Sequence, residues 1–243
     1  MVAVEIQAGS PNRDFLALGT SAVTYALLVA QFIYRHSDRA FLSVERIRLY
    51  FTGAGATWGA LAEFGVAAPV DVEGICAVLM DGDSSARHLA QEQLRHVISA
   101  HGLTMRVARS APIDPTGADA IGDRPYSVTV EVVPSEWPFR RASSLATGLV
   151  PTLFERVRQH LGAPREKYSS EVRFPTGNPY LGLFLREVSL SNVDRFVADI
   201  RVSVPGDPIG ARVTASKDRI TIVAGRISSL GAVSRRYLTL AAS

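Results

Sequence analysis

Two segments with strict alternation of apolar and polar residues constrain the fold of this 243-residue chain most strongly. Residues 126–133 place Val128, Val130 and Val132 between polar neighbours, and residues 196–204 alternate in the same way. Successive side chains of a β-strand point to opposite faces, so a period of two predicts strands with one buried face. Half-buried strands are typical of antiparallel sheets, and we therefore expect residues 126–243 to be mainly antiparallel.

The first 110 residues have a different pattern, in which expected strands and helices alternate along the chain. Strands are predicted at 2–7, 41–51, 74–80 and 103–108, and helices at 12–34, 57–64 and 84–101. Gly65 and Gly102 would end the second and third of these helices, since glycine favours the position after a helix. This order of elements predicts a layered α/β arrangement for residues 1–110.

Residues 111–125 combine prolines, glycines and aspartates and are expected to form a loop or a boundary. One further helix is predicted near 151–161, where Pro151 suits a first helical turn, and short strands are predicted at 209–214 and 219–224. The expected fold class is α+β, a layered mixed sheet with helices. Its two parts, 1–110 and 126–243, would be separate or would continue one sheet.

Residues 15–34 form an uncharged stretch whose length would allow it to cross a bilayer as a helix. Its polar residues Thr20, Thr24 and Gln31 fall on one helical stripe, which favours a helix packed on protein. We therefore expect a buried helix, with a membrane anchor as the alternative. The side chains expected to face the interior are those of Leu16, Val23, Leu27 and Ala30.

Charge and cysteine content narrow the classes of function. The 26 basic and 23 acidic residues leave a formal net charge of only +3, and arginines are scattered among acids. Nucleic-acid binding is therefore not supported by the charge pattern, which would require a basic patch or stripe. Cys76 is the single cysteine and lies in an apolar run, so it is expected to be a buried thiol. No intrachain disulfide is possible, and we expect a cytoplasmic protein.

A glycine-containing segment is the first candidate site. Gly53, Gly55, Thr57 and Gly59 are expected to lie between a strand and a helix, where backbone N–H groups can hold a phosphate. Asp81 follows the next expected strand, where a dinucleotide-binding fold would place an acid for the ribose. The alternative for these glycines is a tight turn that lets the helix pack on the sheet.

The same region, residues 44–54 followed by Asp71-Val72-Glu73, resembles part of the nucleotidyltransferase core of the DNA polymerase β type. The resemblance implies that Asp71 and Glu73 hold Mg²⁺ against a nucleoside triphosphate. It covers fewer than 40 residues, and Ala54 or Ala56 stands where that family has a phosphate-binding serine. Asp81 and Asp83 are further candidate carboxylates for a cation, and the alternative for Asp81-Gly82-Asp83 is a turn and a helix cap.

Two other groups of residues are weaker candidates. His88, Glu92 and His96 would recur on one face of the expected helix 84–101, where imidazoles can share a metal or simply face solvent. Trp137, between two prolines, is either an anchor for a partner or part of the core.

No catalytic motif emerges from these patterns. The expected function is therefore that of a non-catalytic interaction or assembly subunit, with a protein partner or a homo-oligomer and no cofactor. The alternative is a nucleotide-binding enzyme that uses residues 53–59, the nearby carboxylates and Mg²⁺.

Overall fold

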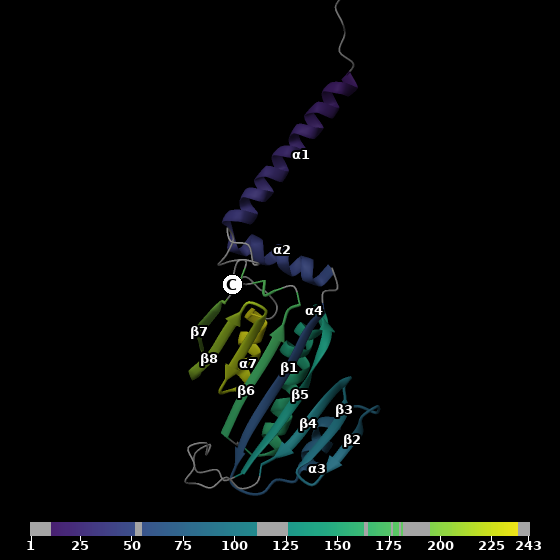
Figure 1. The fold of residues 1–243 in the computed structure, drawn as a ribbon, viewed down its shortest axis with the longest axis vertical. Helices are drawn as coiled ribbons and strands as arrows, with labels where there is room; N and C mark the ends of the chain where they lie inside the picture. Colours follow the sequence, from purple (N-terminus) through teal and green to yellow (C-terminus); the bar gives the residue numbers. More distant parts are fainter. Residues whose placement is uncertain are drawn as a thin grey trace, which may run out of the picture.

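A computed structural model describes residues 11–51, 55–110, 126–162, 165–175, 177–179, 181 and 195–237. Its centre is one nine-stranded sheet in which all strand pairs are antiparallel, in the order β2-β3-β4-β5-β1-β6-β9-β8-β7 (Figure 1). The strands are β1 (Gly55–Val66), β2 (Arg87–Glu92), β3 (Arg95–Ala100), β4 (Leu103–Arg109), β5 (Tyr126–Pro138), β6 (Arg165–Arg173), β7 (Val197–Val204), β8 (Asp207–Ser216) and β9 (Arg219–Ala224).

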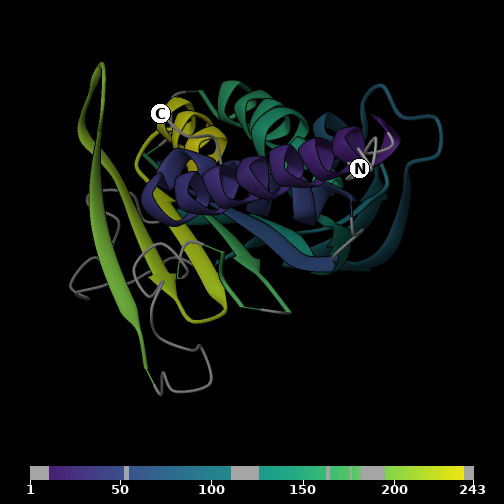
Figure 2. The same cartoon turned by 90° about the horizontal axis from the view of Figure 1, so that it is seen from above.

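One face of this sheet is covered by helices (Figure 2). The covering elements are α3 (Val72–Met80), α4 (Phe139–Ser144), the π-helix η1 (Leu145–Leu149), α5 (Val150–His160) and α7 (Ile227–Tyr237). On the opposite face, which we call the open face, none of the described helices packs. An antiparallel sheet tolerates this asymmetry because alternate residues of each strand are polar.

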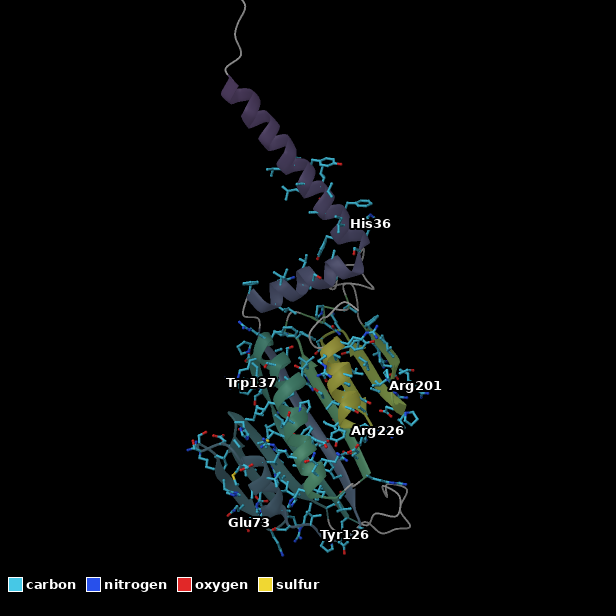
Figure 3. The ribbon with its side chains drawn as sticks, turned by 180° about the vertical axis from the view of Figure 1, so that it is seen from behind. His36, Glu73, Tyr126, Trp137, Arg201 and Arg226 are labelled. Atoms are coloured by element: carbon cyan, nitrogen blue, oxygen red, sulfur yellow. The ribbon has the colours of Figure 1, made fainter. Side chains whose placement is uncertain are left out.

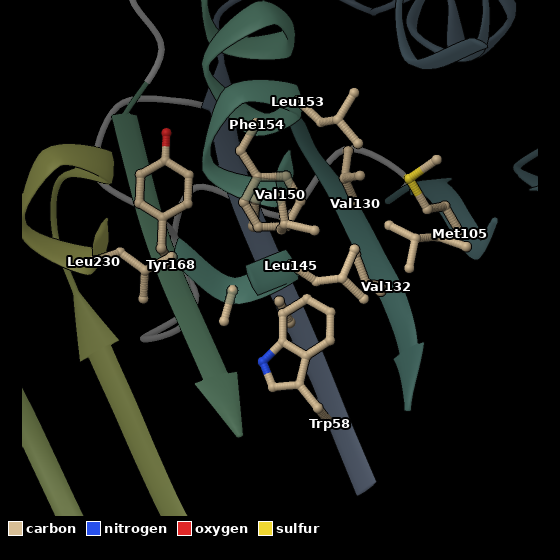
Figure 4. Close-up of a cluster of buried hydrophobic side chains, with 14 of the residues drawn as sticks. Trp58, Met105, Val130, Val132, Leu145, Val150, Leu153, Phe154, Tyr168 and Leu230 are labelled. Atoms are coloured by element: carbon tan, nitrogen blue, oxygen red, sulfur yellow. The ribbon is translucent and has the colours of Figure 1, made fainter. Parts of the chain in front are cut away.

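The core lies between the sheet and these helices (Figure 4). Trp58 and Tyr168 extend from neighbouring strands, and the ring of Phe154 from α5 stacks on that of Tyr168, with centroids 5.9 Å apart. The buried indole Nε1 of Trp58 donates a hydrogen bond to Ser170 Oγ at 3.0 Å. This satisfied donor lets a large polar-tipped side chain fill the centre of the core.

The helices α1 (Pro11–His36) and α2 (Asp38–Phe51) precede the sheet and lie at one end of it (Figure 1). We call the sheet and the helices that cover it the body of the protein. α2 packs on this body through the buried side chains of Phe41 and Leu49. α1 instead projects away from the sheet, and the side chains of Val23 and Leu27 are 60% and 65% exposed. The expectation that Val23, Leu27 and Ala30 face the interior is therefore wrong, and the side chain of Leu16 lies outside the described residues.

Four elements expected between residues 41 and 101 have the opposite type in the structure. Residues 41–51 and 74–80 are helical, in α2 and α3, while 57–64 belong to β1 and 84–101 contain the β2–β3 hairpin. The apolar run at 74–80 has no clear period, and the capping of α3 by Asp71 favours the helix. In β1, the buried Trp58, Ala60 and Ala62 do alternate, but alanine also favours helix.

Most of the remaining predictions that fall on described residues agree with the structure. The α+β class is confirmed, and strands occur near 103–108, 126–133, 196–204, 209–214 and 219–224, with a helix near 151–161. β4 and β5, on either side of 111–125, are neighbours in the same sheet. The expected strand 2–7 and the loop 111–125 themselves lie outside the described residues. Within the described part of the chain, no helix has the length and apolar content needed to cross a bilayer.

Candidate functional site

The glycines expected to form a phosphate-binding loop lie at the start of a central strand. Gly55, Thr57 and Gly59 are part of β1, which pairs with β5 on one side and β6 on the other. Gly53 lies outside the described residues. No helix follows these residues directly, because β1 continues to Val66. The predicted turn into a helix is therefore wrong, and with it the helix N-terminus that would have held a phosphate.

Gly59 has a different structural role. It lies at a shift in the β1–β5 register, and a Cβ atom added there would come within 2.9 Å of the Pro134 ring. A hollow of about 550 Å³ opens beside it on the open face, lined in part by Thr57, Glu131 and Glu171. Glu131 pairs with Arg106 at 2.6 Å and Glu171 with Arg173 at 2.7 Å, so these two carboxylates of the hollow already have cationic partners.

The four candidate carboxylates lie around α3 rather than beside Gly55 and Gly59. Asp71 caps the start of α3 by accepting hydrogen bonds from the N–H groups of Glu73 and Gly74 at 3.0 and 3.1 Å. Asp81 follows the end of the same helix. Glu73 lies toward one end of the sheet, whereas Trp137, beside the partner of Gly55, lies toward the other (Figure 3).

Asp83 stabilises a turn. Its carboxylate accepts hydrogen bonds from the N–H and hydroxyl of Ser85, at 2.9 and 2.7 Å, and from the N–H of His101. These bonds, that of the Ser85 hydroxyl first, lower the pKa of Asp83 to about 2. His101 and Gly102 connect β3 to β4 with positive φ angles, so Gly102 belongs to a hairpin and does not end a helix.

The histidines expected on one helix face lie instead on the β2–β3 hairpin. The rings of His88 and His96 are 6.0 Å apart, and His96 Nδ1 lies 3.8 Å from the sulfur of Cys76. Burial, followed by the negative charges of Asp71 and Glu73, raises the pKa of Cys76 to about 11. Among the described residues, no group of three or more histidine, cysteine, aspartate or glutamate side chains is arranged to hold a metal. Nucleotide and Mg²⁺ binding at the predicted residues stays a prediction.

The clearest unexplained surface belongs to α1 and α2. We define the α1–α2 apolar surface as the exposed residues Val23, Tyr25, Leu27, Leu28, Val29, Phe32, Ile33, Val44, Ile47 and Phe51. Phe32 is 64% exposed and Phe51 86%. A contiguous exposed apolar patch is uncommon on a monomer and marks an interaction site.

The exposed apolar residues of α1 cover most of its circumference, apart from the stripe that carries Thr24 and Gln31. Val23, Leu28 and Ile33 follow at intervals of five residues, which turns each side chain by about 140° from the one before. They therefore cover three sides of the helix. An apolar surface this wide exceeds the single stripe that a helix buries against one neighbouring element.

α2 adds a second apolar stripe beside α1. Val44, Ile47 and Phe51 recur at helical spacing on its exposed side, while Phe41 and Leu49 face the body. The two helices meet where the rings of Tyr34 and Phe41 lie 5.2 Å apart, and the hydroxyl of Tyr34 lies 3.5 Å from a Glu45 carboxylate oxygen. At this junction α1 and α2 contact each other.

Trp137, the residue expected as an anchor or a core side chain, is half-buried at the edge of the core. The guanidinium of Arg141 lies over its ring, 4.4 Å from the centroid. Within the described residues its buried Nε1 has no hydrogen-bond partner. A role for Trp137 in partner binding stays a prediction.

Comparison with known proteins assigns no family to this chain. No model of a protein family matches the sequence, and a search of curated proteins finds no similar sequence. Its site must therefore be judged from the residues themselves.

The sequence did contain one signal for the α1–α2 apolar surface. The uncharged stretch 15–34 predicts a helix with one buried face, whereas the structure exposes several of its sides. The contribution of α2 was missed because residues 41–51 were expected to form a strand. A helical period at Val44, Ile47 and Phe51 would have indicated a second stripe.

Proposed function

We propose that this protein is a non-catalytic assembly subunit that associates through the α1–α2 apolar surface, and that its partner there is a second copy of the chain. The observation that carries the proposal is the exposure of apolar side chains on three sides of α1. Burying such surface is favourable by about 25 cal/mol per Å². A protein partner would supply this burial.

A second copy fits the arrangement of the two helices. A helix with apolar residues on three sides needs more than one neighbour, and two copies would bring the partner's α1 and α2 against each α1. Such a dimer is self-complementary, as a two-fold interface requires. Residues 15–34 carry no charge, so α1 could be enclosed there without burying an unpaired ion.

Light scattering coupled to size-exclusion chromatography tests the proposal on the full chain. We expect a dimer or larger assembly at micromolar concentration, and a shift to monomer when Leu28→Ser and Phe32→Ser are combined. Each lost apolar contact is worth about 1.5–3 kcal/mol if fully buried, so the dissociation constant of the dimer should rise at least tenfold. Leu89→Ser, on an exposed residue of β2, is the matched control and should leave the assembly intact.

Three results would contradict the proposal. The wild-type chain could be monomeric across this concentration range, or the double variant could associate as tightly as the control. The chain could also float with phospholipid vesicles and require detergent for extraction, in which case lipid rather than a second copy covers α1. Circular dichroism of the double variant establishes that its body remains folded.

A further inference from the structure

A second hollow lies on the open face, near the edge of the sheet formed by β7 and β8. Its volume is about 680 Å³, and Lys167, Arg201 and Arg212 line it together with Ile209, Gly210 and Val223. None of the described residues that line it is a carboxylate. The hollow is therefore bordered by three cations from three different strands.

The arginines at this hollow face each other across the strand pair. Arg201 of β7 is directly opposite Arg212 of β8 in the register. Like charges at directly opposed positions destabilise a sheet. An arrangement that opposes folding in this way is characteristic of a functional site.

Neighbouring acids neutralise only part of this charge. Arg212 Nε lies 3.6 Å from a carboxylate oxygen of Asp199, and Lys167 Nζ lies 3.6 Å from one of Glu63. Arg201 has no ion pair with another described residue. Its guanidinium is thus available, beside a second guanidinium, for an anion that approaches from the open face.

The space between these cations arises from two glycines. The Ala211–Ala224 pair joins β8 to β9, and Gly210 and Gly225 directly adjoin it. Neither glycine has a side chain, so Val223 and the backbone are left to line the hollow, with Ile209 as an apolar wall. Gly210 has a φ of +68°, and a Cβ atom there would collide with the carbonyl oxygen of Val202.

We propose that this hollow binds a diphosphate group, either free or as part of a nucleoside diphosphate. Arginine forks match phosphate oxygens in two-pronged hydrogen bonds, and Lys167 would add a compact positive charge. A bound phosphate would also relieve the repulsion between Arg201 and Arg212. The volume accommodates more than a single phosphate, and Ile209 offers an apolar surface to the remainder of a larger ligand.

Calorimetric titration of the full-length protein with inorganic pyrophosphate, at constant ionic strength, tests this site. We expect saturable binding to the wild type and at least tenfold weaker binding to Arg201→Gln. Arg173→Gln is the matched control, because Arg173 is exposed on the same face but outside this hollow. Its affinity should stay within twofold of the wild type. A parallel titration with ADP distinguishes the ligands: equal affinity indicates the diphosphate alone, and tighter binding indicates a nucleoside contact.

Arg201→Glu provides a readout that does not depend on binding. It replaces a like-charge pair by an opposite-charge pair, so the melting temperature without ligand should rise while pyrophosphate binding is lost. The proposal is overturned if the wild type does not bind pyrophosphate, or if Arg173→Gln loses as much affinity as Arg201→Gln. A lower melting temperature of Arg201→Glu would refute the repulsion on which the site rests.

Discussion

The helices α1 and α3 are both rich in apolar residues, yet they stand in opposite relations to the rest of the molecule. α3 buries Val72, Ile75, Cys76 and Leu79 against the body, whereas α1 leaves its apolar residues exposed on several sides. Apolar content alone therefore does not reveal what covers a helix. α3 has one stripe matched to a sheet, and α1 has no face that a single sheet could satisfy.

The largest expected difference between the body and α1 concerns two phenylalanines. Phe154→Ala should lower the free energy of unfolding by about 3–5 kcal/mol, because this ring is fully buried and stacked on Tyr168. Phe32→Ala should change the unfolding of the body by less than about 0.5 kcal/mol, since the ring is exposed within one chain. Chemical denaturation monitored by tryptophan fluorescence measures both. Equal losses would show that α1 unfolds together with the body in a shared core.

An intermediate effect should show whether the tight fit of the body extends to its edge hairpin. Gly210→Ala should destabilise the protein by about 1–3 kcal/mol, because the positive φ and the close Val202 carbonyl both exclude a Cβ atom. Gly231→Ala on α7 is the control: nothing lies within 4 Å of the added atom, and alanine favours helix by up to about 1 kcal/mol. Thermal melts of the two variants should shift in opposite directions. If Gly210→Ala leaves the melting temperature unchanged, the hairpin can adopt another register.

The smallest expected effect separates two helix caps. Asp71→Ala removes two hydrogen bonds at the start of α3 and should cost about 1 kcal/mol of global stability. Ser37→Ala removes the bond from the N–H of Ala40 to the Ser37 hydroxyl, 3.3 Å, near the start of α2. Its effect should be confined to α1 and α2, where hydrogen exchange would accelerate while the midpoint of global unfolding stays unchanged. If that midpoint shifts as much as it does for Asp71→Ala, the pair α1–α2 and the body unfold as one cooperative unit.

The predictions from sequence succeeded where polar and apolar residues alternated without ambiguity. β5 and β7 alternate between polar and apolar residues, so their periodicity identified them directly. Predictions failed for 74–80, where an apolar run is compatible with either element, and for β1, whose alanines obscure its period of two. Asp71 is predicted only as a metal ligand, and the structure uses it as a helix cap. For Asp83 the sequence leaves a cation ligand and a turn or cap open, because short carboxylates suit both, and the structure shows it in a turn.

The hollow between β7 and β8 could not have been found from the sequence. Val204 is opposite Asp207, and a regular hairpin continued from that pair would place Gly210 opposite Arg201. A shift in the register instead brings Arg212 to that position. Gly210 has a positive φ within the shifted part of β8, and the adjacent Ala211 pairs with Ala224 of β9, an arrangement that the local sequence does not specify.

By itself, the sequence determined the α+β class, the antiparallel strands of the second half and the uncharged character of residues 15–34. These properties depend on local periodicity and composition, which each segment carries independently of its neighbours. Only the tertiary structure decided the type of the ambiguous elements, the exposure of α1 and the meeting of Arg201 with Arg212. These depend on which surfaces distant segments present to one another, because burial and strand register are properties of pairs of segments rather than of any one of them.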